Sequence, residues 1–306
     1  MTWRKTPDIS RADLPVAIVT GAGAGIGRAL SVRLVRNGYI VYAGVRNLKR
    51  ARQDYDDLVH VDALRLIELD VNEPDHIEEL VHTIQEREKG RIDLLVNNAG
   101  YGLYGAFEEL TDEQFRDQFE TNFFGVQRMV RSFLPFMRQR RSGKILNVSS
   151  ILGQMALPLG SAYTSSKWAL EAFSESLRYE VAPFGVHIVL IEPGLIRTRF
   201  KKNMVRARAS RVGHSPYAPF HPLLEDESYR GLSTSAPAAA RRIAQIADYK
   251  SPARRYRVGT DSHMAYFLRW LLPAAFQDLI LRTYIQRLYH RNKKAQKRHA
   301  AKSPAT

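Results

Sequence analysis

The chain has 306 residues, 44% of them hydrophobic, and no cysteine. That length allows one large domain with a full core, and the lack of cysteine excludes disulfides, cysteine nucleophiles and cysteine-based metal sites. The net charge of +15 comes mainly from residues 197–211 and 262–306, because the chain before them is nearly neutral. No nucleic-acid-reading motif accompanies these basic segments, so an anionic membrane surface fits them better than nucleic acid.

The sequence divides into three parts. Residues 1–14 form a polar lead without the apolar segment of a secretory signal, and no run of eighteen apolar residues occurs. We therefore predict a cytoplasmic protein without a transmembrane span, in which residues 15–261 form one catalytic domain and residues 262–306 an extension. Residues 195–235 are rich in proline, glycine and serine. A segment so long and irregular predicts a lid over the substrate.

Short apolar segments alternate with segments of helical periodicity. The expected strands are residues 16–20, 39–45, 63–69, 93–96, 144–148, 186–191 and, last, 256–259. The expected helices are residues 28–36, 75–89, 112–140, 162–182 and 236–249, with Pro135 as a kink or break in the third. This alternation predicts an α/β fold: a single-domain Rossmann fold with a doubly wound parallel sheet and a C-terminal helical extension.

A glycine-rich turn joins the first expected strand to the first helix. It reads Gly21-Ala-Gly-Ala-Gly25-Ile-Gly27. Glycines at such a turn let a dinucleotide's pyrophosphate approach the helix N-terminus. A plain tight turn is the alternative, but the position directly after the first buried strand favours dinucleotide binding.

The end of the second strand indicates which dinucleotide is bound. An acidic residue there would bind the ribose of NAD, but this strand ends Ala-Gly-Val-Arg46 without an acid. Arg46 is suited to bind a 2′-phosphate, and Arg50 could assist it. A solvated surface arginine is the alternative. We favour NADP(H) over NAD(H).

Residues 97–100, Asn-Asn-Ala-Gly, close the fourth expected strand. They lie at the carboxyl edge of the sheet, where folds of this kind bind ligands, and their small residues would let the backbone pass close to a cofactor. Asparagine and glycine are also ordinary turn residues. The segment alone does not separate a cofactor contact from a turn.

Three side chains around the fifth strand could meet one reacting carbonyl. Ser150 follows that strand, and Tyr163 and Lys167 are four residues apart on the next expected helix, so they share one face. A lysine ammonium beside a tyrosine lowers the tyrosine pKa and suits it for acid–base work. The Ser150 hydroxyl could stabilise charge on a substrate oxygen. An ordinary helical tyrosine and lysine are the alternative for the pair alone.

Together these motifs resemble the short-chain dehydrogenase/reductase family. The glycine turn, residues 97–100, Ser150, the Tyr163–Lys167 pair and Pro193-Gly194 stand in that family's order and spacing from about residue 15 to 198. The sequence is most similar to the branch containing 17β-hydroxysteroid and retinol dehydrogenases. One departure is Ala24, since many NADP-using members carry a basic residue there. The NADP prediction therefore rests mainly on Arg46.

The resemblance implies a role for each matched position. Tyr163 would donate or accept the proton, Lys167 would lower its pKa and hold the nicotinamide ribose, and Ser150 would polarise the carbonyl. Ser150 rather than Ser149 matches the family's spacing to the tyrosine, and Asn122 would hold a water and complete the tetrad. The cofactor contacts implied are Thr20, Gly21, Gly25, Ile26, Gly27, Arg46, Asp70 at the adenine, Val71, Asn98, Ala99, Gly100, Tyr163, Lys167, Pro193, Gly194 and Thr198 at the carboxamide.

The residues that flank the tetrad are mainly apolar. On a cleft wall they would exclude water and suit a hydrophobic substrate, while core packing is the alternative for each. The expected substrate pocket is Leu103, Ser150, Leu152, Met155, Leu157, Tyr163 and Leu195. No metal ligands are predicted.

The C-terminal extension has the pattern of an amphipathic helix. Its apolar face is Leu279, Ile280, Leu281, Tyr284, Ile285, Leu288 and Tyr289, and its polar face is Asp278, Arg282, Gln286 and His290, with more basic residues following. Such a helix could lie on a membrane surface, dock on its own domain or pack against a second subunit in a homo-oligomer.

We therefore predict an NADP-dependent oxidoreductase. It would interconvert a hydroxyl and a carbonyl on a hydrophobic small molecule resembling a steroid, retinoid or lipid. The alternative is a nucleotide-binding scaffold or sensor at a membrane surface that keeps the fold without chemistry. The intact set of Ser150, Tyr163 and Lys167 counts against that alternative.

Overall fold

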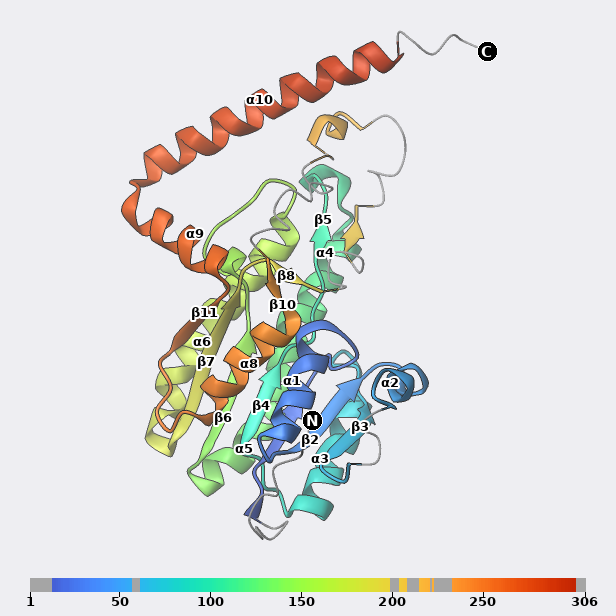
Figure 1. Cartoon of the computed structure of the whole chain (residues 1–306), viewed down its shortest axis with the longest axis vertical. Helices are drawn as coiled ribbons and strands as arrows, with labels where there is room; N and C mark the ends of the chain where they lie inside the picture. The colour runs from blue at the N-terminus through green and yellow to red at the C-terminus, as the bar shows by residue number, and fades with distance from the viewer. Residues whose placement is uncertain are drawn as a thin grey trace.

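The computed structural model describes residues 13–56, 61–198, 204–207, 215–220, 222 and 233–300, with side chains of the last helix described to residue 293. One seven-stranded sheet runs through the described chain in the order β11-β7-β6-β4-β1-β2-β3 (Figure 1). Its strands are β1 Val16–Val19, β2 Ile40–Val45, β3 Leu64–Glu68, β4 Leu94–Asn97, β6 Gly143–Val148, β7 Val186–Pro193 and β11 Arg255–Val258. All neighbouring strands are parallel, as predicted.

Helices cover both faces of the sheet, and alternate residues of β1 show this division. Ala17 and Val19 belong to one buried cluster, with α1 (Gly25–Arg36), α2 (Leu48–Asp54) and α8 (Ala236–Asp248). Val16 and Ile18 belong to the other, with α3 (Pro74–Glu88), α5 (Gly125–Arg140) and α6 (Ser161–Val181). Successive strand side chains point to opposite faces, so a strand buried on both faces is continuously apolar. Helix α2 was not predicted.

The long helix expected over residues 112–140 is interrupted, but not at Pro135. It consists of α4 (Asp112–Phe119), a π-helical turn η4 (Glu120–Phe124) and α5. Pro135 lies inside α5, which runs on to Arg140. The π-turn places one extra residue in the helix, a feature that often marks functional sites. It carries the buried Asn122.

The segment expected to be an irregular lid contains short strands. Strand β5 (Leu103–Tyr104) pairs with β9 (Val205–Arg206), and β8 (Ile196–Arg197) pairs with β10 (Thr234–Ser235). A short 3₁₀ turn, η8, covers Ala218–Phe220. The other parts of residues 195–235 fall outside the described residues. Further 3₁₀ turns are η3 (Phe107–Glu109), η5 (Ile151–Gly153) and η6 (Ala182–Phe184).

Two helices form the C-terminal extension, α9 (Thr260–Leu271) and the long α10 (Ala274–Ala300), which lies across one end of the molecule (Figure 1). The later part of α10 docks on the body: Leu288 is buried, the Tyr289 ring lies 5.2 Å from Phe220, and Asn292 Nδ2 donates to the Pro219 carbonyl at 2.8 Å.

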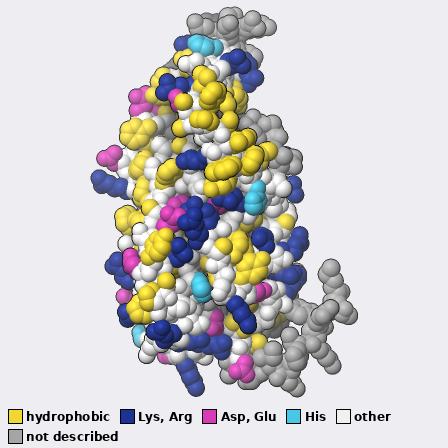
Figure 2. Space-filling view, turned by 90° about the vertical axis from the view of Figure 1, so that its left-hand side faces the viewer, with side chains coloured by type: hydrophobic (Ala, Val, Ile, Leu, Met, Phe, Trp, Pro, Cys, Tyr) yellow, Lys and Arg dark blue, Asp and Glu magenta, His cyan; other side chains and the backbone are white. Residues whose placement is uncertain are grey.

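The first part of α10 and most of α9 instead present apolar side chains to solvent. The exposed ones are Met264, Phe267, Leu268, Trp270, Leu271, Phe276, Leu279, Ile280, Leu281 and Tyr284. In Figure 2, hydrophobic side chains gather in the upper part of the view, over these helices. Among the residues the structure describes, no helix is both long and apolar enough to span a membrane. Of the alternatives predicted for this helix, docking on its own domain is observed only for the later part of α10.

Candidate active site

Thr20 joins the ends of two neighbouring strands at the carboxyl edge of the sheet. Its Oγ1 accepts hydrogen bonds from the backbone N–H of Asn98 at 3.0 Å and of Ala99 at 2.9 Å. Asn98 Nδ2 in turn donates to the Thr20 carbonyl at 2.9 Å and the Gly21 carbonyl at 3.2 Å. Thr20 is buried, so its side chain shapes the cofactor loop rather than reaching solvent.

An added Cβ would clash at two of the three matched glycines. A Cβ on Gly21 would lie 2.7 Å from the Ala99 Cα, and one on Gly27 would lie 2.4 Å from the Gly21 carbonyl oxygen. Gly21 and Gly25 also have positive φ, of 63° and 58°, which favours glycine. No side chain caps the N-terminus of α1. Its N–H groups and this cradle therefore fit a dinucleotide pyrophosphate.

Arg46 follows β2 at the same edge. Its side chain is exposed and makes no hydrogen bond or ion pair within the described part of the chain. Asn47 caps α2 by accepting from the Arg50 backbone N–H at 2.9 Å, and Arg50 lies 4.0 Å from Asp54. Arg46 is therefore available to an anionic ligand.

Asp70 and Val71 follow β3 at the same edge of the sheet. The Asp70 carboxylate accepts from the Asn72 backbone N–H at 3.0 Å, which fixes the turn there. Val71 is buried against α5, where a Cβ on Gly125 would lie 2.5 Å from it. The backbone, more than the Val71 side chain, would meet an adenine here.

Asn122 is fully buried and forms hydrogen bonds with the backbone of the segment that follows β4. Its Oδ1 accepts from the Tyr101 N–H at 3.1 Å, and its Nδ2 donates to the Tyr101 carbonyl at 3.0 Å and to Ser166 Oγ at 3.2 Å. A Cβ on Gly100 would lie 3.0 Å from this Oδ1. The π-turn thus fixes the segment that passes between the cofactor cradle and α6.

Tyr163 and Ser150 are both buried and in contact. Ser150 Oγ accepts from the Leu152 N–H at 3.1 Å. Burial raises the pKa of Tyr163 to about 12, and a hydrogen bond with Ser150 opposes the rise. The sequence predicted that Lys167 lowers the tyrosine pKa, whereas in the structure burial is the largest effect and raises it.

Lys167 lies behind the tyrosine ring. Its Nζ donates to the Val148 carbonyl at 2.8 Å and is 6.0 Å from the Tyr163 ring centroid. Burial lowers the pKa of Lys167 to about 8, and the charge of Glu171 opposes that fall. A buried lysine with a pKa so close to neutrality is typical of functional sites.

Pro193 ends β7, Gly194 follows it, and Thr198 lies beside the glycine turn. Gly194 N–H donates to the Val258 carbonyl at 2.9 Å, and a Cβ there would collide with the Asp261 carboxylate. Thr198 contacts the glycine turn, since a Cβ on Gly25 would lie 3.2 Å from its Cβ. The start of the expected lid therefore lies on the cofactor cradle.

The expected pocket residues differ in exposure. Leu103 and Leu152 are buried, Met155 is half-buried, and Leu157 and Leu195 are exposed. Leu103 belongs to β5, where its backbone N–H donates to Gln118 Oε1. Leu103 therefore packs in the core and does not line a pocket. The exposed Leu157 and Leu195 can contact an apolar ligand.

Sequence reasoning missed two groups around the tetrad. The Tyr104 ring lies 5.7 Å from the Tyr163 ring, and strand β9 holds Tyr104 in place. Behind Lys167, Glu171 meets Arg255 from the last strand. The spacing of Tyr163, Lys167 and Glu171, four residues each, could have indicated the carboxylate. Nothing local in the sequence brings Arg255 to it.

Comparison with known proteins agrees with this site. A family model described as short chain dehydrogenase matches residues 15–209. The chain belongs to the short-chain dehydrogenase/reductase family and is an oxidoreductase acting on CH–OH groups. Among the described residues, no group of three or more histidine or acidic side chains is arranged to hold a metal ion.

Named relatives lie in several branches. A 3-ketodihydrosphingosine reductase of Bacteroides thetaiotaomicron is 35% identical over 249 residues, or 80% of this chain and 87% of that protein. Retinol dehydrogenase 8 of Bos taurus is 32% identical over 262 residues, 81% and 83% of the two chains. The human 17-beta-hydroxysteroid dehydrogenase type 1 is 34% identical over 213 residues, 67% of this chain and 64% of that protein. The family is thereby confirmed, and two of these relatives are of the kinds named in the predicted branch.

Solved structures share the fold. A short-chain dehydrogenase from Streptomyces avermitilis superposes with a TM-score of 0.74 at 33% identity, over 89% of this chain and 98% of that chain. A short chain dehydrogenase from Burkholderia cenocepacia in complex with NADP gives a TM-score of 0.65 at 28% identity, again over 89% and 98%. The predicted single-domain Rossmann fold is confirmed.

Proposed function

We propose that the protein uses NADP(H) to interconvert a hydroxyl and a carbonyl on a hydrophobic molecule, with Tyr163 as proton donor and acceptor. The observation that carries this proposal is the arrangement of Tyr163, Ser150 and Lys167. All three are buried at the carboxyl edge of the sheet, beside a glycine turn where an added Cβ on Gly21 or Gly27 would clash with its neighbours.

The side chains divide the chemistry between them. The nicotinamide supplies or accepts the hydride when it is bound. Tyr163 donates its proton to the substrate oxygen during reduction and accepts one from the hydroxyl during oxidation. Ser150 donates a hydrogen bond to the same oxygen as negative charge develops there. Lys167 holds the ribose and adds positive charge behind the tyrosine ring.

Arg46 supports NADP(H) as the dinucleotide. It is exposed at the end of β2, where no acidic side chain precedes it to repel a phosphate. A guanidinium there can bind a 2′-phosphate through two parallel hydrogen bonds. The NADP complex of the Burkholderia relative accords with this choice.

Replacing Arg46 tests the choice of dinucleotide. We expect Arg46→Asp to weaken NADPH binding by about tenfold or more while changing NADH binding little, because a charge-assisted pair becomes a repulsion. Fluorescence titration with both cofactors gives the ratio of dissociation constants. Arg52→Asp is the matched control, because Arg52 is an exposed arginine of α2 to which no cofactor contact is assigned. An unchanged ratio in Arg46→Asp would show that Arg46 does not meet the phosphate.

The substrate is proposed to be steroid-, retinoid- or lipid-like. Leu157 and Leu195 present apolar surface, and Tyr104 adds an aromatic wall against Tyr163. A sphingoid-base reductase and a retinol dehydrogenase among the relatives accord with a hydrophobic substrate.

A screen of NADPH consumption tests the activity. Long-chain 3-keto amines, retinal, ketosteroids and long-chain aldehydes are the substrates to compare, each against Tyr163→Phe protein. We expect turnover of at least one apolar carbonyl, abolished in the variant. NADPH binding without turnover of any compound would favour the silent scaffold instead.

We further propose that α9 and α10 contact an anionic membrane surface. Their exposed apolar side chains include Trp270, which is 73% exposed, and the extension carries nine basic residues against one acidic residue from position 262 onward. Apolar side chains beside basic ones fit a lipid interface, where burial and charge act together. The earlier part of the apolar face of α10 is exposed, because the later residues Leu288 and Tyr289 are the ones that pack on the body.

Vesicle co-sedimentation tests this contact. The double variant Leu279→Glu, Ile280→Glu should lose binding to phosphatidylserine-containing vesicles without losing stability, because both side chains are already exposed. Gln286→Glu with His290→Glu adds the same charge to the polar face and should weaken binding much less. Equal binding by both double variants would contradict a buried apolar face. No binding by the unaltered chain would reject the membrane contact.

A further inference from the structure

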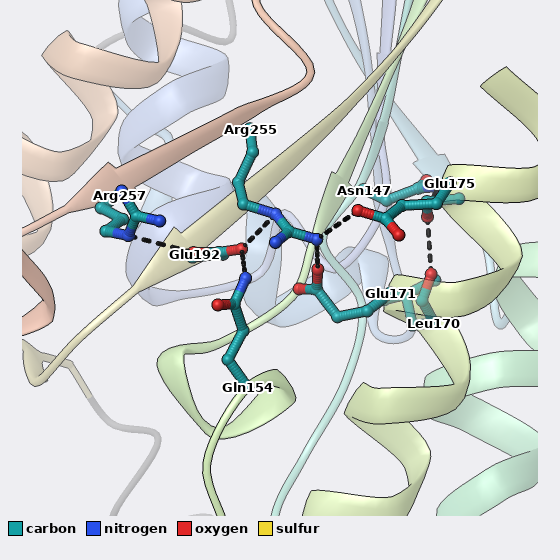
Figure 3. Close-up of polar contacts among 9 residues, drawn as sticks. Asn147, Gln154, Leu170, Glu171, Glu175, Glu192, Arg255 and Arg257 are labelled. Carbon is teal, nitrogen blue, oxygen red and sulfur yellow. Dashed lines mark hydrogen bonds and ion pairs between the residues drawn. The ribbon is translucent and has the colours of Figure 1, made fainter. Parts of the chain in front are cut away.

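Five charged side chains form an ionic cluster beyond the proposed catalytic lysine: Arg255, Arg257, Glu171, Glu175 and Glu192 (Figure 3). Arg255 Nη2 lies 2.8 Å from Glu171 Oε2 and 2.9 Å from Glu175 Oε1, while its Nε lies 2.7 Å from Glu192 Oε1. Arg257 approaches the other Glu192 oxygen at 3.6 Å, and Gln154 donates to Glu192 at 2.6 Å. With Lys167, the cluster holds three positive and three negative groups.

Most of this cluster is removed from water. Glu192 is fully buried, and Glu171 and Lys167 are each 6% exposed. Gly153 closes the space above Glu171, because a Cβ there would lie 2.9 Å from its Cγ and 2.7 Å from Ser149 Oγ. Charges in so dry a site influence one another strongly, and removal of one leaves another unbalanced.

Helix α6 places Glu171 in line with the catalytic pair. Tyr163, Lys167 and Glu171 follow at intervals of four, so all three lie on one face. Lys167 is therefore one helical turn from each of Tyr163 and Glu171, and its Nζ lies 6.0 Å from the Tyr163 ring centroid. Arg255, from the last strand, holds the far side of the carboxylate.

We propose that Glu171 is a positioning residue that keeps Lys167 charged, and that it thereby sets the upper pH limit of proton transfer at Tyr163. The catalytic half of this proposal rests on the function proposed above. Glu171 touches neither the tyrosine nor the reacting atoms; it acts through the lysine. Arg255 and Glu192 keep the carboxylate in place from the sheet.

The charged and polar groups that face Glu171 determine the pH range in which its carboxylate is charged. On its own helix these are Lys167 and Glu175; from the sheet they are Arg255 and Glu192, and Ser149 contributes a hydroxyl. Burial raises the pKa of Glu171 to about 7, against the opposing effects of Ser149 and Arg255. Above that pH the carboxylate is charged and supports the Lys167 ammonium.

Loss of the Glu171 charge should therefore lower the pKa of Lys167 further. The lysine already titrates near 8 because it is buried, and Glu171 is the group that holds its pKa up. Since a charged lysine is needed beside Tyr163, activity should fall at lower pH in a variant without this charge. Neutral Glu171→Gln keeps the shape of the side chain and isolates the charge.

The test uses the full chain labelled with ¹³C at lysine Cε, titrated by NMR without substrate. The Lys167 signal is assigned by its absence from Lys167→Met. We expect Glu171→Gln to lower the Lys167 midpoint by about one unit, the smaller end of the range for a nearby opposite charge. The control is Glu175→Gln, which also removes a partner of Arg255 but lies one turn farther from the lysine; it should leave the midpoint unchanged.

A reduced melting temperature with an unchanged midpoint would overturn the proposal, because Glu171 would then be structural only. If Glu171→Gln does not fold, Ser149→Ala replaces it. Loss of the hydroxyl raises the pKa of Glu171, so the Lys167 midpoint should again fall, and no change would count against the proposal.

The second arm measures kcat/KM against pH with the substrate found by the screen. The alkaline limit should move down by the same amount as the NMR midpoint in Glu171→Gln and stay in place in Glu175→Gln. If the Lys167 midpoint shifts in Glu171→Gln but the alkaline limit of kcat/KM does not, Glu171 does not set the pH limit of proton transfer. Because the NMR arm needs neither substrate nor turnover, it stands even if the proposed activity fails.

Discussion

Gly27 shows how a single hydrogen can decide whether the cofactor cradle forms. Gly27→Ala would place a Cβ 2.4 Å from the Gly21 carbonyl oxygen and 2.5 Å from Asn98 Nδ2. We expect a loss of about 1–3 kcal/mol of stability and a marked loss of dinucleotide affinity, because both neighbours are held in place. Melting curves and cofactor titration measure the two effects.

Gly23→Ala is the matched control in the same turn. The nearest atom to its added Cβ would be Val45 Cγ1 at 3.9 Å, which is ordinary contact. Stability and affinity should stay close to those of the unaltered chain. If both alanine variants behave alike, packing at Gly27 is not what shapes the cradle.

For single residues, the sequence predicted where the candidate catalytic side chains lie better than it predicted their pKa values and contacts. Spacing alone placed Tyr163 beside Lys167, and both lie where the helix pattern put them. The direction of the Tyr163 pKa was missed because burial depends on β5 and α6 together, which no short motif encodes. Thr20 was expected at the cofactor, yet its hydroxyl joins β1 to the end of β4.

Among the elements, α9 and α10 are held to the body differently. In α9, Ser262 Oγ donates to the Glu192 carbonyl at 3.0 Å, and the Tyr266 ring lies 3.2 Å from the Arg257 guanidinium carbon. Most of the large apolar side chains at the start of α10 face solvent. We therefore expect α9 and α10 to contribute differently to the stability of the protein.

Two truncations should separate these helices. A chain ending after Leu272 loses α10 and should melt within a few degrees of the full chain. A chain ending after Thr260 also loses the buried Ser262 and the ring contact with Arg257. It should melt roughly 5 °C lower or more. Equal melting temperatures for the two truncated chains would show that α9 contributes nothing to the body.

The strands of the main sheet were predictable from the sequence, but the position of the break in the long helix was not. Each apolar run produced a strand near its expected bounds, because strands buried on both faces must be apolar throughout. The break in residues 112–140 was placed at Pro135, but the helix tolerates that proline and is interrupted at η4 instead. A π-turn has no sequence signature comparable to proline, so Asn122 came only from the family resemblance.

For the molecule as a whole, the sequence predicted the sheet but not the contacts between side chains that lie far apart in the chain. Alternation of strands and helices was enough to predict parallel pairing. The ionic cluster joins α6, β7 and β11, and Arg255 lies 84 residues from Glu171. Such a contact follows from topology rather than from local pattern, and the same holds for Tyr289 against Phe220.

The most direct test of the proposed function is the turnover rate of Tyr163→Phe, measured together with its NADPH affinity. The substitution removes only the hydroxyl from a buried ring, so NADPH should bind nearly as it does to the unaltered chain. We predict that kcat falls by about 10²–10⁴-fold, the usual loss when an acid–base group is removed. A variant that binds NADPH normally and keeps more than about a tenth of kcat would contradict the role of Tyr163.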